Sequence, residues 1–252
     1  KKELLPGVLG KLRNYIGEGG NMLVLGKPGK QYVLNPLLAP AGVRLMEGQL
    51  VAPTYNETPD KVKTYFTPAS FDLAEESTFR KYKYLWSNNV RKDSLKIVLG
   101  GVTGLLHTNN TGFAAVPLLA TCPGEAWLKA GRLKVDSTAP VFSPREGDIR
   151  EASFPVGLQL SRKIKGKEQR IIVCGDADLA SNLRLVGDFV SCIYSWLNYN
   201  KFPVYTPVPY AKDNKVVLSP SGAAVHKIVY IWVLPGLILI AGAVLLTRRK
   251  RK

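Results

Sequence analysis

The residues with the clearest chemical potential are two aspartates, Asp176 and Asp178, in a segment that reads Gly-Asp-Ala-Asp-Leu-Ala-Ser-Asn over positions 175–182. They directly follow residues 170–174, whose apolar run 171–173 predicts a buried strand. In open α/β sheets, ligands bind beyond the carboxyl ends of strands, where two carboxylates could hold a hard cation or a polyhydroxyl ligand. Together with Ser181 and Asn182, these aspartates form a candidate ligand or partner loop.

The same loop has a structural interpretation. Asp176 and Asp178 can cap a following turn, and Ser181 and Asn182 can fix the loop through local hydrogen bonds. Because no third metal-ligand residue accompanies the two aspartates in this segment, we favour the structural role. We therefore predict neither a bound metal nor any other cofactor.

Nucleophilic catalysis has little support in the sequence. The two histidines are His107 in a polar turn and His226 near the C-terminal apolar segment, and no GxSxG or GxCxG elbow surrounds any serine or cysteine. His107 could meet Cys122 or Cys174 as a Cys–His pair, but the pattern gives no reason to place them together. Residues 26–30 (Gly-Lys-Pro-Gly-Lys) lack the GxxxxGK[ST] spacing of a phosphate loop. We predict a protein that is not an enzyme and has no catalytic residues.

The three cysteines, Cys122, Cys174 and Cys192, show no CxxC spacing and allow at most one disulfide, whose pairing the sequence leaves open. Cys174 ends the apolar run 171–173 and is expected to be a buried, small hydrophobic residue.

The formal net charge is +16, and the last five residues, 248–252, are all cationic. The remainder of the chain is therefore basic as well. No aromatic-plus-basic signature of a nucleic-acid module accompanies these charges, so we expect no nucleic-acid partner and a basic surface that faces anionic membrane lipid.

Residues 228–247 form an uninterrupted uncharged segment of twenty residues, twelve of them Leu, Ile or Val. As a helix this segment would extend about 30 Å, the thickness of the hydrocarbon core of a bilayer. The cationic residues 248–252 follow it, and Tyr230 and Trp232 lie near its other end. The positive-inside rule then places residues 248–252 in the cytoplasm and the main domain outside it.

The pattern of the preceding residues predicts an α/β domain with a mostly parallel sheet, because helices and strands alternate at the start of the chain. Expected helices cover residues 4–16, 32–38 and 185–197, and expected strands cover 21–26, 43–51, 95–99, 114–119, 154–160 and 170–174. Residues 163–167 read as a basic turn, and residues 52–78 as a long excursion. The predicted organisation is a domain over 1–199, a proline-containing linker over 200–227, a transmembrane helix over 228–247 and a basic tail over 248–252.

Several short motifs occur in a particular order along the chain. They are residues 12–25 (Leu-Arg-Asn-Tyr-Ile-Gly-Glu-Gly-Gly-Asn-Met-Leu-Val-Leu), 35–38 (Asn-Pro-Leu-Leu) with Gly42 and Val43, 117–121 (Pro-Leu-Leu-Ala-Thr) with Trp127, 170–178 (Arg-Ile-Ile-Val-Cys-Gly-Asp-Ala-Asp) with Ser181 and Asn182, Trp196 with Leu197, and the final apolar segment with Pro235, Gly242 and the terminal block that begins Arg248-Arg249. In this order the chain resembles the auxiliary subunit of the ABC-type transport system associated with bacterial gliding motility.

The resemblance implies a glutamine-amidotransferase-like α/β fold without the catalytic cysteine elbow of that superfamily. It also implies a bacterial inner-membrane protein whose main domain is periplasmic, with an ABC permease subunit and a cytoplasmic ABC ATPase as partners. Relatives carry further N-terminal sequence, which leads us to expect that the chain continues before Lys1. Leu179 stands where an aromatic residue is common, and the segment between Asn182 and Leu185 is short.

Two alternatives remain at the level of sequence. The Asp176-Ala177-Asp178 triplet mimics the DxD metal site of nucleotide-sugar glycosyltransferases, where two carboxylates hold a divalent ion against a diphosphate. A scaffold or adhesion ectodomain without a transporter would carry the same membrane segment.

Overall fold

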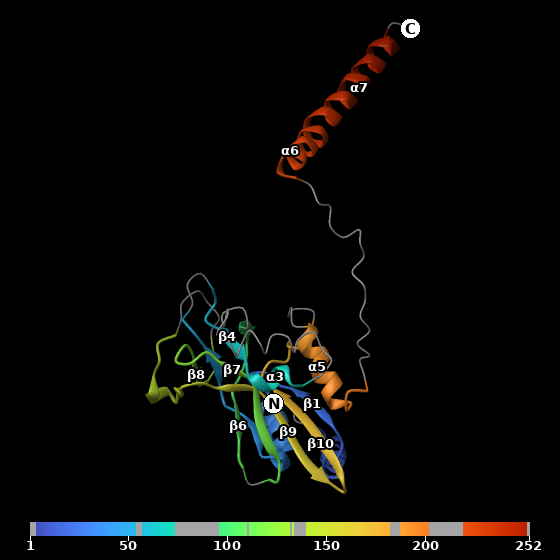
Figure 1. Ribbon diagram of the computed structural model, residues 1–252. Helices are drawn as coiled ribbons and strands as arrows, with labels where there is room; N and C mark the ends of the chain where they lie inside the picture. The colour runs from blue at the N-terminus through green and yellow to red at the C-terminus, as the bar shows by residue number, and fades with distance from the viewer. Residues whose placement is uncertain are drawn as a thin grey trace. The chain divides into compact units, whose positions relative to one another are not determined.

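The computed structural model describes residues 4–53, 57–73, 96–109, 111–131, 133, 140–181, 187–201 and 219–250 (Figure 1). The chain separates into two compact units, Lys1–Tyr205 and Thr206–Lys252. The first unit is an α/β domain, and the second contains one long apolar helix. Each unit is described by itself.

A six-stranded sheet organises the α/β domain, with the strand order β1-β10-β9-β7-β4-β5. The strands are β1 (Met22–Leu25), β4 (Lys61–Phe66), β5 (Lys96–Gly100), β7 (Ala114–Thr121), β9 (Pro155–Ile164) and β10 (Lys167–Cys174). Among these strands, β1 and β10 pair in parallel, and the other four neighbouring pairs are antiparallel. The prediction of a mostly parallel sheet was therefore wrong.

The direction of the strands follows from the short turn between β9 and β10. Lys165 and Gly166 form a two-residue connection in which both residues have positive φ, 50° and 78°. Two such residues make a type I′ turn, whose twist matches an antiparallel hairpin. Because a parallel connection needs a crossover of a dozen or more residues, β9 and β10 can only pair antiparallel.

Two small antiparallel sheets extend the domain beyond the main sheet. The predicted strand 43–51 is divided into β2 (Val43–Leu45) and β3 (Gln49–Val51), which pair with β6 (Leu105–His107) and β8 (Trp127–Lys129) respectively. The chain bends at Gly48, whose φ is +128° and where a Cβ atom would lie 2.3 Å from the carbonyl oxygen of Lys129. Only glycine tolerates this combination of backbone angle and close approach.

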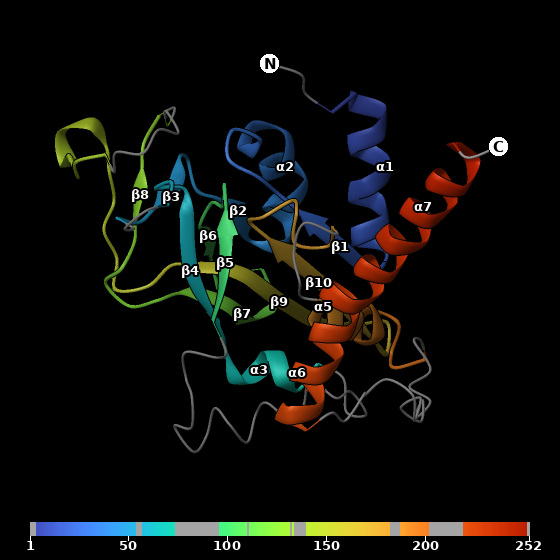
Figure 2. The ribbon, with the colours of Figure 1, turned by 90° about the horizontal axis from the view of Figure 1, so that it is seen from above.

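Helices cover both faces of the main sheet (Figure 2). On one face lie α1 (Pro6–Gly17) and α2 (Gln31–Leu38), which continues into a 3-10 turn at Ala39–Ala41. On the other face lie α5 (Gly187–Leu197) and the short α3 (Pro68–Phe71).

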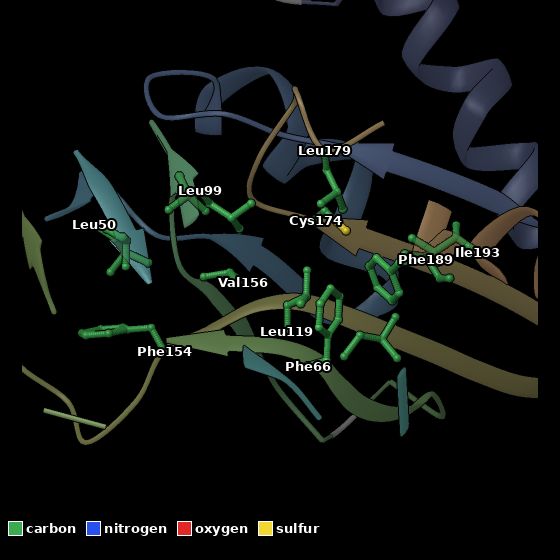
Figure 3. Packing of buried hydrophobic residues seen from close by; sticks show 14 of the residues in the cluster. Leu50, Phe66, Leu99, Leu119, Phe154, Val156, Cys174, Leu179, Phe189 and Ile193 are labelled. Atoms are coloured by element: carbon green, nitrogen blue, oxygen red, sulfur yellow. The ribbon is translucent and has the colours of Figure 1, made fainter. Parts of the chain in front are cut away.

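The buried strand β10 connects the two hydrophobic layers of the domain. Ile171 and Val173 pack with Ile16 of α1 and Leu38 of α2. Ile172 and Cys174 point to the opposite face and join the cluster that contains Phe189 and Ile193 of α5 (Figure 3). Burial on both faces explains why residues 171–174 form an apolar run instead of an alternating pattern.

The C-terminal unit contains α6 (Pro220–Ile228), a π-helical turn η6 (Val229–Val233) and α7 (Leu234–Lys250) in continuous succession. Ser219 caps the helix, because its hydroxyl accepts a hydrogen bond from the N–H of Gly222 at 3.1 Å. The π turn ends at Val233, two residues before Pro235, which has no N–H to donate to the preceding turn. The helix begins at Pro220, eight residues before the predicted start at position 228.

Within the described residues, one helix is long and apolar enough to cross a membrane, and it comprises the 29 residues Ser221–Arg249. At 1.5 Å per residue it extends about 43 Å, more than the roughly 30 Å of a hydrocarbon core. The additional length corresponds to residues 221–227 and 248–249, which include the charged residues Lys227, Arg248 and Arg249.

A buried carboxylate fixes the segment that follows β8, which includes the 3-10 turn Pro144–Glu146. The Asp148 side chain accepts hydrogen bonds from the N–H groups of Ala130 (3.0 Å) and Ser143 (2.9 Å). The Lys129 ammonium also pairs with Asp148, at 3.2 Å, and with Glu146. Burial alone would raise the pKa of Asp148, but the two backbone N–H groups and Lys129 outweigh it and hold the pKa below its ordinary value.

Asp148→Asn is expected to lower the free energy of unfolding by about 2–3 kcal/mol near pH 7, because an amide cannot replace a carboxylate that accepts from three donors. The pKa of Asp148 in the folded protein lies below its unfolded value of about 3.9. The stabilisation of the folded state by ionised Asp148 is therefore fully present above the unfolded pKa and is lost as the pH falls through the folded pKa. Chemical denaturation should therefore show a smaller difference in unfolding free energy between Asp148→Asn and wild type at pH 3 than at pH 7. An equal difference at both pH values, or the same profile for the exposed control Glu151→Gln, would contradict this role.

Candidate functional site

Hydrogen bonds to three other segments of the chain hold the start of the loop that follows β10. The N–H of Gly175 donates to the carbonyl of Val156 at 2.8 Å, and the carbonyl of Gly175 accepts from the N–H of Thr103 at 3.1 Å. One residue earlier, the carbonyl of Cys174 accepts from the N–H of Gly26 at 2.7 Å. The loop therefore starts from a rigid position at the carboxyl edge of the sheet.

Local hydrogen bonds determine the shape of the loop itself. The Oδ1 atom of Asp176 accepts from the N–H of Asp178 at 2.8 Å, the geometry of an Asx turn. The hydroxyl of Ser181 donates to the carbonyl of Asp178 at 2.7 Å. Asn182, the fourth residue of the candidate loop, lies outside the described residues.

The two aspartates have different environments. Asp176 is only 2% exposed, so its carboxylate is engaged inside the protein. Leu179 is 1% exposed and extends from the loop into the cluster that contains Cys174 and Phe189 (Figure 3). Asp178 and Ser181 are partly exposed. Asp178 is thus the carboxylate that this loop presents to solvent.

The loop lies at a topological switch point of the sheet. The parallel strands β1 and β10 end at the same edge, and the chain then turns to α2 on one face and to α5 on the other. Ligands of open α/β sheets bind in the crevice at such a point. The basic residues Lys27 and Lys30 follow β1 in the same way that Asp176 and Asp178 follow β10. Sequence reasoning treated these two loops separately, and the parallel pairing brings them to one edge.

A pocket of about 360 Å³ lies beside the loop that follows β1, within the range of small-molecule sites. Its lining includes Gln31, Tyr32 and Glu47. The Gln31 amide donates to the carbonyl of Met46 at 2.8 Å, and the Thr103 hydroxyl donates to the same carbonyl at 3.0 Å. Thr103 therefore links the wall of this pocket to the aspartate loop.

The cysteines and histidines do not form a nucleophilic pair in the described part of the chain. Cys122, Cys174 and Cys192 are buried thiols. Burial, together with the charge of Asp176, raises the pKa of Cys174 to about 12, which keeps its thiol protonated. His107 ends β6 and lines a separate pocket of about 380 Å³. No group of three or more His, Cys, Asp or Glu residues that could hold a metal ion occurs among the residues that the structure describes.

No protein-family model matches the chain, and no curated protein matches it. A solved structure described as the mmIFT52 N-terminal domain is similar over 80% of this chain and 75% of that chain, with 14% sequence identity and a TM-score of 0.48. A likeness of this extent supports no inference about function.

Variants of the two aspartates should differ in stability. Asp176→Ala is expected to lower the free energy of unfolding by about 1–3 kcal/mol, because it leaves the N–H of Asp178 without its acceptor and a cavity in a buried turn. Asp178→Ala should change it by less than about 0.5 kcal/mol, because its side chain is partly exposed. Denaturation of both variants tests this assignment. Equal losses for both would mean that the loop is not held by Asp176.

Proposed function

We propose that the chain is a non-catalytic, membrane-anchored auxiliary component of an ABC transport system. Its α/β domain would bind a ligand or partner outside the cytoplasm, beside the permease. The observation that carries the proposal is the 29-residue helix Ser221–Arg249, long and apolar enough to cross a membrane, which follows an α/β domain whose motifs resemble the gliding-motility-associated auxiliary subunit.

Three of the motifs of the resemblance are joined in space by one side chain, Asn21. Its Oδ1 atom accepts from the N–H of Arg170 at 2.8 Å, and its Nδ2 atom donates to the carbonyl of Leu197 at 2.7 Å. Asn21 thus connects the motif at residues 12–25 with the motifs at 170–178 and at Trp196 and Leu197. A set of motifs that makes one hydrogen-bonded network supports a common fold more strongly than the same motifs would in isolation.

A second motif residue, Asn35, has a comparable role. Its Oδ1 atom accepts from the N–H of Leu45 at 2.8 Å, and its Nδ2 atom donates to the carbonyl of Leu45 at 3.1 Å. This pair of bonds ties α2 to β2. The proposed fold remains glutamine-amidotransferase-like, with helices on both faces of a sheet and without a catalytic cysteine.

The proposed orientation rests on charge. The tail over residues 248–252 is cationic, and the interfacial aromatics Tyr230 and Trp232 lie toward the other end of the helix. The tail would therefore be cytoplasmic and the α/β domain periplasmic, in a bacterial inner membrane. The helix would contact membrane lipid and the permease subunit, and the permease would in turn bind the cytoplasmic ATPase.

The glycosyltransferase alternative is less well supported by the geometry of the aspartate loop. A DxD site needs both carboxylates directed at a metal ion. Here Asp176 is buried and accepts from the N–H of Asp178. Manganese-dependent binding of a nucleotide sugar that is lost in Asp178→Ala would restore this alternative, and a scaffold or adhesion role would be favoured if no transporter accompanies the chain.

The proposal is tested by reconstituting the transporter in vesicles with and without this subunit. We expect that omitting the subunit lowers both substrate transport and the ATPase rate, and that adding back the full chain restores them. Unchanged transport and ATPase rates without the subunit would contradict the proposal.

A further inference from the structure

The hairpin that joins β9 and β10 carries a cluster of lysines at one end of the α/β domain. Lys163, Lys165 and Lys167 are all exposed. The type I′ turn at Lys165 and Gly166 fixes the backbone that carries them. In the described part of the chain, none of these three ammonium groups pairs with a carboxylate. The hairpin therefore presents three uncompensated cations to solvent.

The chain leaves the α/β domain beside this hairpin. After α5, the hydroxyl of Tyr199 donates to the carbonyl of Glu168 at 2.6 Å. The centroid of the Tyr199 ring lies 5.1 Å from the Lys167 ammonium and 4.7 Å from the Arg170 guanidinium. Two residues later, Lys201 is the last described residue before the C-terminal helix and is exposed. The point from which the chain continues toward the membrane helix is thus held next to the lysine cluster.

The backbone at this exit is held in an unusual conformation. Tyr199 and Asn200 have φ angles of 56° and 60°, which are unfavourable for residues other than glycine and persist where surrounding contacts determine them. Those contacts come from α5. The N–H of Asn200 donates to the carbonyl of Ser195 at 2.8 Å, and the hydroxyl of the buried Ser195 donates to Oδ1 of Asn200 at 3.1 Å. The fold therefore determines where the exit lies.

The charge at this end of the domain is strongly one-sided. The end is formed by the loop after α1, the β9–β10 hairpin and the exit, which are residues 17–21, 162–170 and 197–201. The first of these segments approaches the hairpin closely, because a Cβ atom at Gly19 would lie 2.7 Å from Cγ2 of Ile164. The three segments contain six cations and two carboxylates, Glu18 and Glu168. Since Glu168 already accepts from Arg170 at 2.7 Å, the exposed lysines give this end a clear excess of positive charge.

A membrane surface is the partner that this position and charge favour. Residues 202–218 separate the exit from Ser219, the cap of the C-terminal helix, and a segment of this length spans at most about 60 Å. The domain therefore stays within reach of the bilayer in which the helix is anchored. Anionic headgroups attract cationic side chains within about a Debye length, and each lysine near such a surface strengthens binding by a factor of about five.

We propose that the hairpin lysines 163, 165 and 167, together with Lys201, dock the α/β domain on the anionic headgroups of the membrane that holds its C-terminal helix. The proposal rests on the membrane anchor of the proposed function and is independent of the transporter. Because β10 runs from the hairpin to the aspartate loop, docking at the hairpin directs that loop away from the lipid. The loops at the switch point then stay accessible to a ligand or partner.

Docking is measured on the full chain in vesicles, by energy transfer from a dye on Asn198→Cys to acceptors on the lipid headgroups. Asn198 is exposed beside the exit, and the native cysteines are buried, so a membrane-impermeant maleimide dye labels this position on chains whose domain faces outward. We expect more transfer in phosphatidylcholine vesicles with about one third phosphatidylglycerol than in phosphatidylcholine alone. Raising NaCl from about 0.05 M to about 0.5 M should remove this difference, because salt shortens the range of the attraction.

A variant without the three hairpin charges tests the assigned residues. Lys163→Gln, Lys165→Asn, Lys167→Gln should lower the ratio of docked to undocked domain at least tenfold, and asparagine at position 165 suits the positive φ of the turn. The control Lys27→Gln, Lys30→Gln, Lys61→Gln removes the same charge from exposed positions outside the three segments and should keep the wild-type ratio. Thermal denaturation verifies folding, and the salt dependence of wild type decides the test if the hairpin variant is unstable.

Flotation of the vesicles separates the two ways in which the proposal can fail. A chain that does not float with the vesicles would overturn the membrane anchor, and this proposal with it. A chain that floats but gives equal transfer with and without phosphatidylglycerol would overturn lipid docking alone and favour an acidic protein surface as the partner of the hairpin. Equal losses in the two triple variants would overturn the assignment to the hairpin.

Discussion

Gly175→Ala is expected to destabilise the α/β domain by about 3 kcal/mol or more. A Cβ atom at this position would lie 2.0 Å from the carbonyl oxygen of Thr103 and 3.0 Å from its carbonyl carbon. Neither backbone can move away freely, because Gly175 donates to Val156 and accepts from Thr103. The added methyl group therefore overpacks this contact and forces the aspartate loop away from the segment that contains Thr103. The expected loss of stability lies at the upper end of the range for overpacked sites.

The measurement is urea denaturation of the full chain in detergent, followed by tryptophan fluorescence. Gly10→Ala is the matched control, because Gly10 is an exposed residue in the middle of α1 and no atom lies within 4 Å of an added Cβ. That control should stabilise the protein by about 0.5–1 kcal/mol through helix propensity. If Gly175→Ala unfolded at the same urea concentration as wild type, the predicted close contact between Gly175 and Thr103 would be contradicted.

Two arginines in the centre of the C-terminal helix are expected to release the chain from the membrane. The twelve Leu, Ile and Val residues of positions 228–247 favour insertion by roughly 4–6 kcal/mol. Leu239→Arg with Ile240→Arg adds about 5–7 kcal/mol of unfavourable transfer and removes two favourable contributions. The sum of these terms no longer favours the bilayer.

Extraction of membranes with alkaline carbonate measures the result directly. We expect wild type to remain in the membrane pellet and the double arginine variant to appear in the supernatant. The apolar exchange Leu239→Ile with Ile240→Leu keeps the composition of the helix and should remain in the pellet. Retention of the double arginine variant would show that this helix is not the membrane anchor.

Elements with a strong hydrophobic pattern were predictable from the sequence. The amphipathic pattern of residues 4–16 corresponds to α1, and the apolar runs at 21–26 and 170–174 correspond to β1 and β10. By contrast, β4 was missed within the predicted excursion 52–78. Its buried positions, Val62, Thr64 and Phe66, do alternate with exposed or partly exposed ones, but a buried threonine and the surrounding prolines weakened the signal.

Strand direction was not predictable from the alternation of helices and strands at the start of the chain. The connection between strands decides it, and the informative signal was the two-residue turn at Lys165 and Gly166. A glycine in the middle of a short basic turn between two apolar runs is typical of a hairpin. The sequence interpretation recognised the turn without drawing this conclusion.

The candidate sites depended on burial and on contacts between distant segments. Asp176 and Asp178 are chemically identical in the sequence, and they differ because one carboxylate accepts the N–H of the other residue and is buried. The pocket beside the loop that follows β1 combines Tyr32, Glu47 and Gly131, which no local spacing connects. Such a set becomes visible only when the strands are paired.

Purification of the full chain from its native membrane in mild detergent, followed by mass spectrometry of the accompanying proteins, tests the assignment to an ABC transport system most directly. We predict that a multispanning permease and an ABC ATPase co-purify in stoichiometric amounts with wild type, and not with the Leu239→Arg, Ile240→Arg variant. Recovery of the wild-type chain alone, or with enzymes of envelope synthesis in place of the transporter, would contradict the assignment to an ABC transport system.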